Sequence, residues 1–272
     1  MRLILRTLQI PVSTYYRQCS AQASVSIKAD DPEDQELLEK IKAVKLRRPA
    51  WGYRRVRAWL KKRLGRPLNR KRVYRLMKTA GLLVKTPPHK ASRTPQKEKP
   101  RPIRKNQWWG TDMTKFYVQS VGWVYLVLVL DWFTKKIAGH QMGLRPTTSF
   151  WLQALHMAIQ SECPAGSRSY GLHLMSDNGS QPTSIRYEKE LETLGIDHVT
   201  TSYSNPKGNA DTERVFRTFK EDTIWPNEFD SYDEARAAVD EWVRFYNTEY
   251  PHSSLGELSP MEFEQQLERQ AA

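Results

Sequence analysis

The sequence predicts an α/β protein: a mixed five-stranded sheet with flanking helices, preceded by a small all-helical module. Two observations lead to this prediction. Apolar residues recur at helical spacing through the first third of the chain, and the pattern changes to strand-like segments from Asn106 onward. After that point three strand-like segments come first and are followed by alternating helices and strands, which favours one mixed sheet rather than two separate layers.

Charge divides the chain at the same place. Residues 1–105 contain 29 Lys/Arg and 7 Asp/Glu, whereas residues 106–272 contain 14 and 23. A basic arm beside an acidic body favours a phosphate-binding module next to a carboxylate-bearing core. A solvated basic tail is the alternative, but tails usually lack the helical periodicity found here.

Several classes of protein are disfavoured by composition. Two cysteines cannot build a disulfide scaffold, and the six histidines show no metal-binding spacing. The longest apolar run, 121–133, is shorter than the roughly 20 residues of a membrane helix, and nothing resembles a signal peptide. We therefore expect a cytoplasmic protein with no membrane partner.

Three short helices are predicted in the first third, over residues 32–48, 51–64 and 70–79, with Asn69 capping the third. This pattern is typical of a helix-turn-helix module whose third helix enters a DNA major groove. A basic bundle that contacts phosphates alone is the alternative. The residues expected to contact DNA are the basic ones on the second and third helices: Arg54, Arg55, Arg70, Lys71, Arg72 and Arg75.

Five segments are expected along the chain. A proline-rich basic stretch has the composition of a linker and separates the two main parts. The predicted segments are a junction at 1–30, the helix-turn-helix module at 31–83, the linker at 84–105, the catalytic core at 106–226 and a helical extension at 227–272.

Strands of the core are predicted at 107–118, 123–130, 136–142, 171–177 and 196–200. The first three form a meander, and helices are expected at 147–160, 184–194, 206–224, 231–246 and from Pro260. This order is that of a ribonuclease-H-like fold.

Two acids have strand contexts that indicate function. Asp177 ends a buried strand and precedes a sharp Asn178-Gly179 turn, and strand ends are where α/β sites collect. Asp112 lies within a strand among aromatic residues, where an unpaired carboxylate is costly unless it binds a metal. A surface-facing strand acid is the alternative for Asp112.

Glu213 is separated from Asp177 by 35 intervening residues and lies near the start of a predicted helix. At 100° per residue, Glu213, Arg217 and Lys220 share one side of this helix, and the inward side consists of Thr212, Val215, Phe216 and Phe219. An acid followed by two cations suits a metal-and-phosphate site, although an ordinary solvated helix face has the same composition. Carboxylates of this kind bind Mg²⁺ or Mn²⁺ and leave positions open for phosphate oxygens.

Several ordered motifs resemble the insertion-sequence-three family of transposases, the second-frame product with an aspartate-aspartate-glutamate (DDE) integrase core. They are Gly52-Tyr-Arg-Arg, the segment 69–77, Trp109-Gly-Thr-Asp112, Ser176-Asp177-Asn-Gly-Ser-Gln, Gly208-Asn-Ala-Asp-Thr-Glu213 with the helix after it, Tyr246-Asn247, Pro251-His-Ser-Ser-Leu-Gly and Ser259-Pro260. The resemblance covers about residues 35–265. The sequence departs from it at Met175, where the family often has His, and at Pro182, where an aromatic residue is usual.

The resemblance implies an enzyme that nicks element ends and transfers a 3′-hydroxyl onto a phosphodiester. Asp112, Asp177 and Glu213 would be its catalytic metal ligands, for two Mg²⁺ ions that Mn²⁺ can replace. Lys220 would contact donor DNA, with Arg217 and Asn178 nearby. The expected partners are double-stranded DNA at element ends and target, further copies of the chain on DNA, and the DNA-binding product of the upstream frame. This places the protein at the bacterial nucleoid.

Three other functions share parts of this pattern. A retroviral-type integrase normally adds a zinc-binding His/Cys module, which the scattered histidines disfavour. A ribonuclease H needs a fourth core acid, for which Asp131 is a weak candidate because it ends a strand. A DNA-binding regulator with an inactive core is the alternative from a different class.

Overall fold

The computed structural model describes residues 32–84, 100–201 and 209–271. Its first part is a module of three helices, α3 (Pro32–Arg47), α4 (Tyr53–Leu64) and α5 (Arg70–Thr79), close to the predicted ranges. The helices pack around apolar side chains that are almost fully buried: Leu37, Ile41, Val56, Leu60, Val73 and Met77. The side chain of Asn69 accepts a hydrogen bond from the Lys71 N–H and caps α5, as predicted.

The start of α4 differs from the prediction by two residues. The helix begins at Tyr53, with Gly52 in an extended conformation before it. Trp51 therefore lies outside the helix, yet only 1% of it is exposed. Its burial comes from another part of the chain, described below.

The body contains the predicted five-stranded sheet, in the order β3-β2-β1-β4-β5. Its strands are β1 (Trp108–Val118), β2 (Gly122–Asp131), β3 (Ile137–Gly143), β4 (His173–Ser176) and β5 (Asp197–Thr200). The first three pair antiparallel as a meander, and β4 pairs parallel with both β1 and β5. This is the ribonuclease-H-like arrangement, with β1 at the centre of the sheet.

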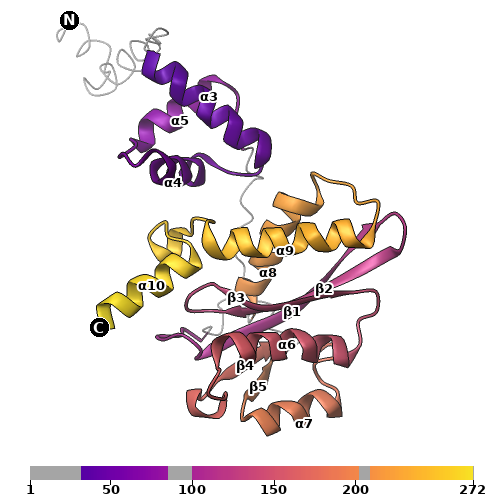
Figure 1. The fold of residues 1–272 in the computed structure, drawn as a ribbon. Helices are drawn as coiled ribbons and strands as arrows, with labels where there is room; N and C mark the ends of the chain where they lie inside the picture. The colour runs from indigo at the N-terminus through magenta and orange to yellow at the C-terminus, as the bar shows by residue number, and fades with distance from the viewer. Residues whose placement is uncertain (1–31, 85–99, 202–208, 272) are drawn as a thin grey trace, which may run out of the picture.

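Helices cover both faces of the sheet (Figure 1). One face carries α6 (Thr148–Glu162) and α7 (Ile185–Leu194), and the other carries α8 (Ala210–Phe219) and α9 (Tyr232–Thr248). A last helix, α10 (Pro260–Ala271), follows α9 and contacts it. The inward residues predicted for the segment after Asn209 are all buried in α8.

The helix predicted over 206–224 changes type at its end. Residues Lys220–Ile224 form a π-helical turn directly after α8, and the predicted residues 206–208 lie outside the described ones. π-helical turns are rare and often occur at functional sites.

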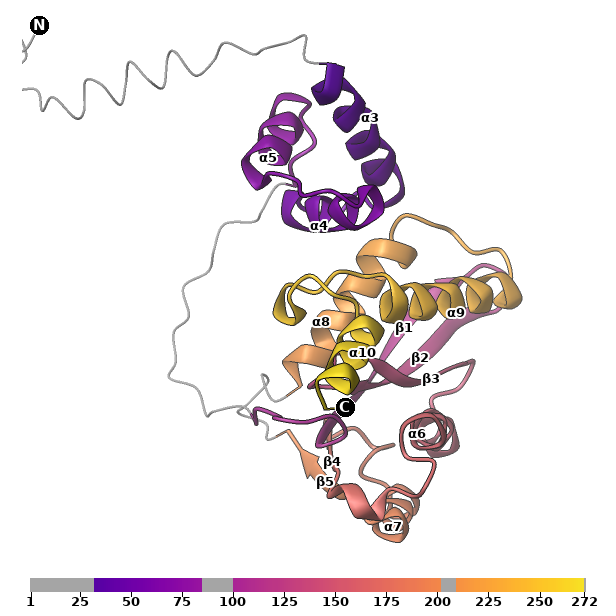
Figure 2. The ribbon, with the colours of Figure 1, turned by 60° about the vertical axis from the view of Figure 1, so that its left-hand side comes forward.

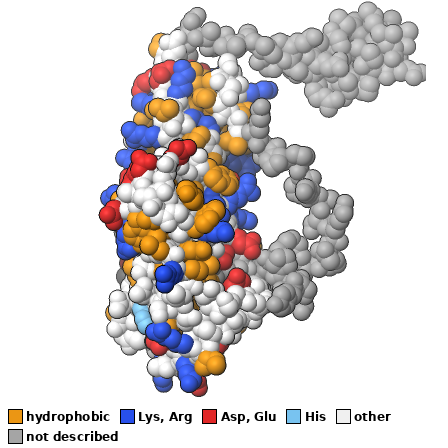
Figure 3. Space-filling view, turned by 90° about the vertical axis from the view of Figure 1, so that its right-hand side faces the viewer, with side chains coloured by type: hydrophobic (Ala, Val, Ile, Leu, Met, Phe, Trp, Pro, Cys, Tyr) orange, Lys and Arg blue, Asp and Glu red, His pale blue; other side chains and the backbone are white. Residues whose placement is uncertain are grey.

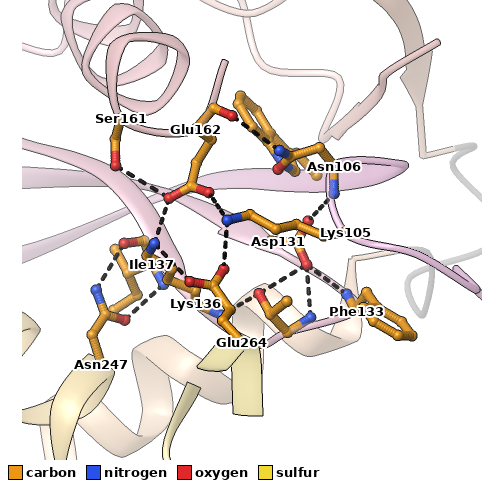
Figure 4. Close-up of polar contacts among 12 residues, drawn as sticks. Lys105, Asn106, Asp131, Phe133, Lys136, Ile137, Ser161, Glu162, Asn247 and Glu264 are labelled. Carbon is orange, nitrogen blue, oxygen red and sulfur yellow. Dashed lines mark hydrogen bonds and ion pairs between the residues drawn. The ribbon is translucent and has the colours of Figure 1, made fainter. Parts of the chain in front are cut away.

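A buried ion cluster joins the C-terminal helix to the body (Figure 4). The Nζ atoms of Lys105 and Lys136 each contact both Glu162 and Glu264, at 2.6–3.0 Å. These residues come from the segment before β1, the turn before β3, the end of α6 and α10. The cluster therefore fixes four elements to one another with its charges balanced.

Asp131, the fourth acid considered from the sequence, is also a structural residue. One of its oxygens accepts hydrogen bonds from the Phe133 and Thr134 N–H groups and the Thr134 hydroxyl, and the other accepts one from the Asn106 N–H. It holds the turn after β2, so it is not a candidate metal ligand.

The described helices include none that is both long and apolar enough to cross a membrane. Viewed from the side, Lys and Arg side chains gather along one edge of the molecule, and acidic side chains lie below them on the same edge (Figure 3).

Candidate active site

The first two predicted acids are brought together by strand register. Strands β1 and β4 pair in parallel, and their last pair is Gly110 with Met175. Asp112 and Asp177 each lie two residues beyond that pair, and they are close enough for the charge of Asp177 to raise the pKa of Asp112. Asp112 is half-buried and Asp177 is exposed where β4 ends.

Helix α8 supplies the third acid by packing closely on β1 at Gly110. A Cβ atom on Gly110 would lie 2.3 Å from the Trp132 indole nitrogen, 2.4 Å from the Thr212 hydroxyl and 2.7 Å from the Asn209 Oδ1, so no other residue fits there without movement. The Asn209 side chain also donates to the Thr111 carbonyl at 2.8 Å. These contacts set the first turn of α8, which contains Glu213, against the strand of Asp112.

Gly110, Asn209 and Thr212 were given no positioning role by the sequence analysis. A glycine inside a strand is a signal for the close approach of another backbone, and this signal was present at Gly110. Asn209 gave none, and helical periodicity predicted Thr212 to face inward without indicating Gly110 as its partner, because both partners are about 100 residues away in the chain.

Asp112 is close enough to Asp177, Glu213 and Lys220 for their charges to affect its pKa. The pKa of Asp112 is raised to about 7, mainly by burial and also by the charges of Asp177 and Glu213, against the lowering effects of the Met113 N–H and the Lys220 charge. The Met113 N–H donates to Asp112 at 2.7 Å, and the Gly179 N–H donates to Asp177 at 3.1 Å. Neither hydrogen bond neutralises the carboxylates.

No cation is paired with these acids in the described part of the chain. Asp211, two residues before Glu213, pairs with Lys135 at 2.9 Å, whereas Glu213, Asp112 and Asp177 form no ion pair with a described residue. Hard oxygen donors with uncompensated charge suit Mg²⁺ or Mn²⁺. Within the described ranges no three His, Cys, Asp or Glu side chains already form a metal-holding group, and Mg²⁺ is commonly held by one or two carboxylates together with substrate phosphates.

The predicted DNA-contacting residues separate into two sets. Arg54, Arg55, Arg70 and Arg217 line one groove of about 580 Å³ between the helical module and the body. Arg72 and Arg75 instead both bind the buried Asp34 of α3, and Arg72 also contacts Glu33 at 3.1 Å. These two arginines hold the module together, which the sequence could not show because Asp34 lies 38 and 41 residues away.

The remaining predicted residues lie at the surface near these features. Lys71 is exposed on α5. Asn178 is exposed beside Asp177, and its amide donates to the Thr201 carbonyl, which ties the end of β4 to the end of β5. Lys220 follows α8 at the π-helical turn.

Comparisons with known proteins agree with this geometry. Residues 32–90 match the family model described as an HTH-like domain, and residues 102–206 and 194–260 match models described as integrase core domain. The chain is 30% identical, over 94% of its length and 95% of the relative, to "Putative transposase for insertion sequence element IS986/IS6110" of Mycobacterium tuberculosis. The chain belongs to the insertion-sequence-three family of transposases.

Two further transposases support the assignment. The chain is 31% identical to "Transposase for insertion sequence element IS904" of Lactococcus lactis, over 72% of the chain and 80% of the relative. It is 29% identical to "Putative transposase InsK for insertion sequence element IS150" of Escherichia coli, over 97% and 93%. Among solved structures, the HTLV-2 integrase catalytic core in complex with magnesium matches with a TM-score of 0.47 and 17% identity, over 60% of this chain and 99% of that one.

Proposed function

We propose that this transposase cleaves DNA strands and transfers a 3′-hydroxyl onto a phosphodiester, moving an insertion element. The observation that supports this most is that three carboxylates, Asp112 on β1, Asp177 after β4 and Glu213 on α8, form no ion pair with a described residue, while the charges of Asp177 and Glu213 both act on Asp112. In each step one P–O bond forms as another breaks, and the proton lost by the attacking oxygen is taken up by the leaving 3′-oxygen. Such chemistry needs positioned charge rather than a protein nucleophile.

Asp112, Asp177 and Glu213 would hold divalent metal, Mg²⁺ with Mn²⁺ as a substitute, in the form of two ions. Metal bound there would supply activation of the attacking oxygen and stabilisation of the leaving one. Lys220 and Arg217, on the same side of the α8 segment as Glu213, would neutralise the phosphate that enters beside these acids. Asn178, next to Asp177, would contact the same DNA strand.

The segments divide the work within this proposal. The module at 31–83 would bind element ends, the stretch at 84–105 would connect it to the core, and the core at 106–226 would perform the chemistry. The extension at 227–272 would support the core, because α9 packs on the sheet and α10 supplies Glu264 to the buried ion cluster.

The proposed reaction indicates which partners the protein would need. Joining two element ends to a target requires both ends in one complex, so the active form would be a homo-oligomer assembled on DNA. The DNA-binding product of the upstream frame would add end recognition. Work on chromosomal DNA would take place in the bacterial cytoplasm, at the nucleoid.

The direct test replaces Asp177, which is exposed and therefore tolerant of substitution. Asp177→Asn should abolish Mg²⁺-dependent strand transfer on duplexes carrying the sequences that flank the coding region, and should bind the same duplexes normally. Asp230→Asn, an equally exposed acid outside the site, is the matched control and should retain activity. Wild-type protein that binds DNA without any strand transfer would support the regulator with an inactive core instead.

A further inference from the structure

A groove between the helical module and the body carries a strong positive charge. Its lining includes five arginines and two glutamates: Arg54, Arg55, Arg57, Arg70, Arg217, Glu221 and Glu257. Both glutamates are already paired, Glu221 with Arg217 at 2.8 Å and Glu257 with Arg57 at 2.6 Å. Arg54 and Arg70 are exposed and have no acidic partner among the described residues, so their charges face the groove unneutralised.

The module is anchored to the body by Trp51. The Trp51 ring lies 5.6 Å from Tyr250 and 6.2 Å from Phe245, between ring centroids, and its indole N–H points to the buried Asp222 at 3.4 Å. The guanidinium of Arg48 lies 4.1 Å from the centre of the Phe245 ring. A buried aromatic contact of this kind sets the position of one part on another more firmly than surface ion pairs do.

Ion pairs surround the anchor and fix the same arrangement. Lys62 contacts Glu262 at 2.6 Å, and Arg63 contacts Glu249. Figures 1 and 2 both show α4 on the side of the module that faces the body. The module and the body therefore form the two walls of the groove within a single chain.

The groove and the candidate active site are linked through helix α8 and the π-helical turn after it. Arg217 lines the groove and lies one helical turn after Glu213 on α8. Asp222, which receives the Trp51 indole, lies in the π-helical turn that begins at Lys220. One short segment, 213–222, thus joins the metal-binding acids, the groove and the anchor.

We infer that this groove binds the phosphodiester backbone of the DNA that enters the active site, and that module and active site of the same chain act on the same DNA end. The part of this inference that concerns strand transfer rests on the proposed function, whereas the part that concerns DNA binding by the groove does not. An arginine-lined groove of this size fits a sugar-phosphate backbone and would bind it without regard to sequence.

The binding part is tested with Arg54→Glu/Arg70→Glu in the full chain. Both positions lie in the first turn of a helix, where an acid is favourable, so the variant should fold. Binding to a random-sequence duplex should weaken, and the slope of log affinity against log salt should fall by about 2. Arg244→Glu/Lys189→Glu changes the net charge equally at exposed positions outside the groove and should keep the wild-type slope. Equal slopes in both variants would overturn the groove assignment.

The same-chain part is tested by mixing. Asp177→Asn has an intact groove and a defective active site. Arg54→Glu/Arg70→Glu has a defective groove and an intact active site. If each chain uses its own groove, a mixture of the two should show no more strand transfer than either alone. Recovery of strand transfer in the mixture would overturn the same-chain arrangement. Absence of strand transfer in wild type would instead count against the proposed function, and the salt-slope result would still decide the groove.

Discussion

Two groups of acids in this molecule differ in whether cations pair with them and in the direction of their pKa shifts. Glu162 and Glu264 are buried with two lysines, and these ion pairs outweigh the effect of burial and hold the pKa of Glu162 below its usual value (Figure 4). Asp112 is partly buried, is affected by the charges of two further acids, and pairs with no cation in the part of the chain that the structure describes; its pKa rises to about 7. The first group stabilises the fold. The second has no ion-pair partner among the described residues, which is why we propose it as the functional group.

The largest difference should appear in activity. Asp112→Asn removes a metal ligand and should lower strand transfer by about 10³-fold or more, because metal chemistry supplies several kcal/mol of the barrier reduction. Glu162→Gln should retain activity per folded molecule. The measurement is the strand-transfer rate of each variant, divided by the fraction of native protein determined by circular dichroism. Similar losses in the two would remove the distinction between the groups.

Substitution within the buried ion cluster should instead affect mainly the free energy of unfolding. Lys136→Met leaves two buried glutamates with one lysine and should cost about 3–5 kcal/mol of unfolding free energy. Lys42→Met breaks an exposed pair with Glu39 and should cost less than about 1 kcal/mol. Urea denaturation measures both. A loss at Lys136 no larger than the one at Lys42 would show that the cluster does not stabilise the fold.

A smaller effect is expected at Gly110, where β1 contacts α8. Gly110→Ala forces a Cβ atom against Thr212 and Asn209 and should cost about 1–3 kcal/mol, with reduced strand transfer because Glu213 moves with α8. Gly52→Ala, where the added Cβ meets nothing within 4 Å, is the control. Urea denaturation and strand transfer should both separate the two variants, and equal behaviour would mean that close packing at Gly110 does not position the site.

The last prediction is a dependence of stability on pH. A carboxyl whose pKa is raised on folding makes the folded state bind more protons than the unfolded state, so it lowers stability as pH rises from about 4 to 7. In metal-free protein, the melting temperature of Asp112→Asn relative to wild type should therefore rise over this range and level off above it. Added Mg²⁺ should reduce the difference in melting temperature between Asp112→Asn and wild type at pH 8. A difference independent of pH would show that Asp112 is not an uncompensated charge.

The sequence predicted most of the fold because its signals are local. Helical periodicity, the Asn69 cap and the strand alternation around Asp112 each act within a few residues, and the corresponding elements occur where expected. The family motifs located the candidate acids in the same way. The roles of Asp112, Asp177 and Glu213 remain predictions that the structure makes specific.

What could not be predicted depends on distant partners. Arg72 and Arg75 have the pattern of a DNA-facing helix surface, but Asp34 of another helix binds them both. The sequence predicts Trp51 as the first residue of the second helix, yet it lies before that helix and packs against Phe245 and Tyr250, about 200 positions later. Neither contact can be predicted from the residues that neighbour these side chains in the sequence.

The most direct measurement is Mn²⁺ binding, followed by the electron paramagnetic resonance signal of the free ion, at pH 8 in the full chain. Wild type should bind Mn²⁺, and Asp112→Asn, Asp177→Asn and Glu213→Gln should each weaken binding at least tenfold, while Asp230→Asn should not. Binding that is unchanged in all three variants would contradict the assignment of the uncompensated acids as the metal site.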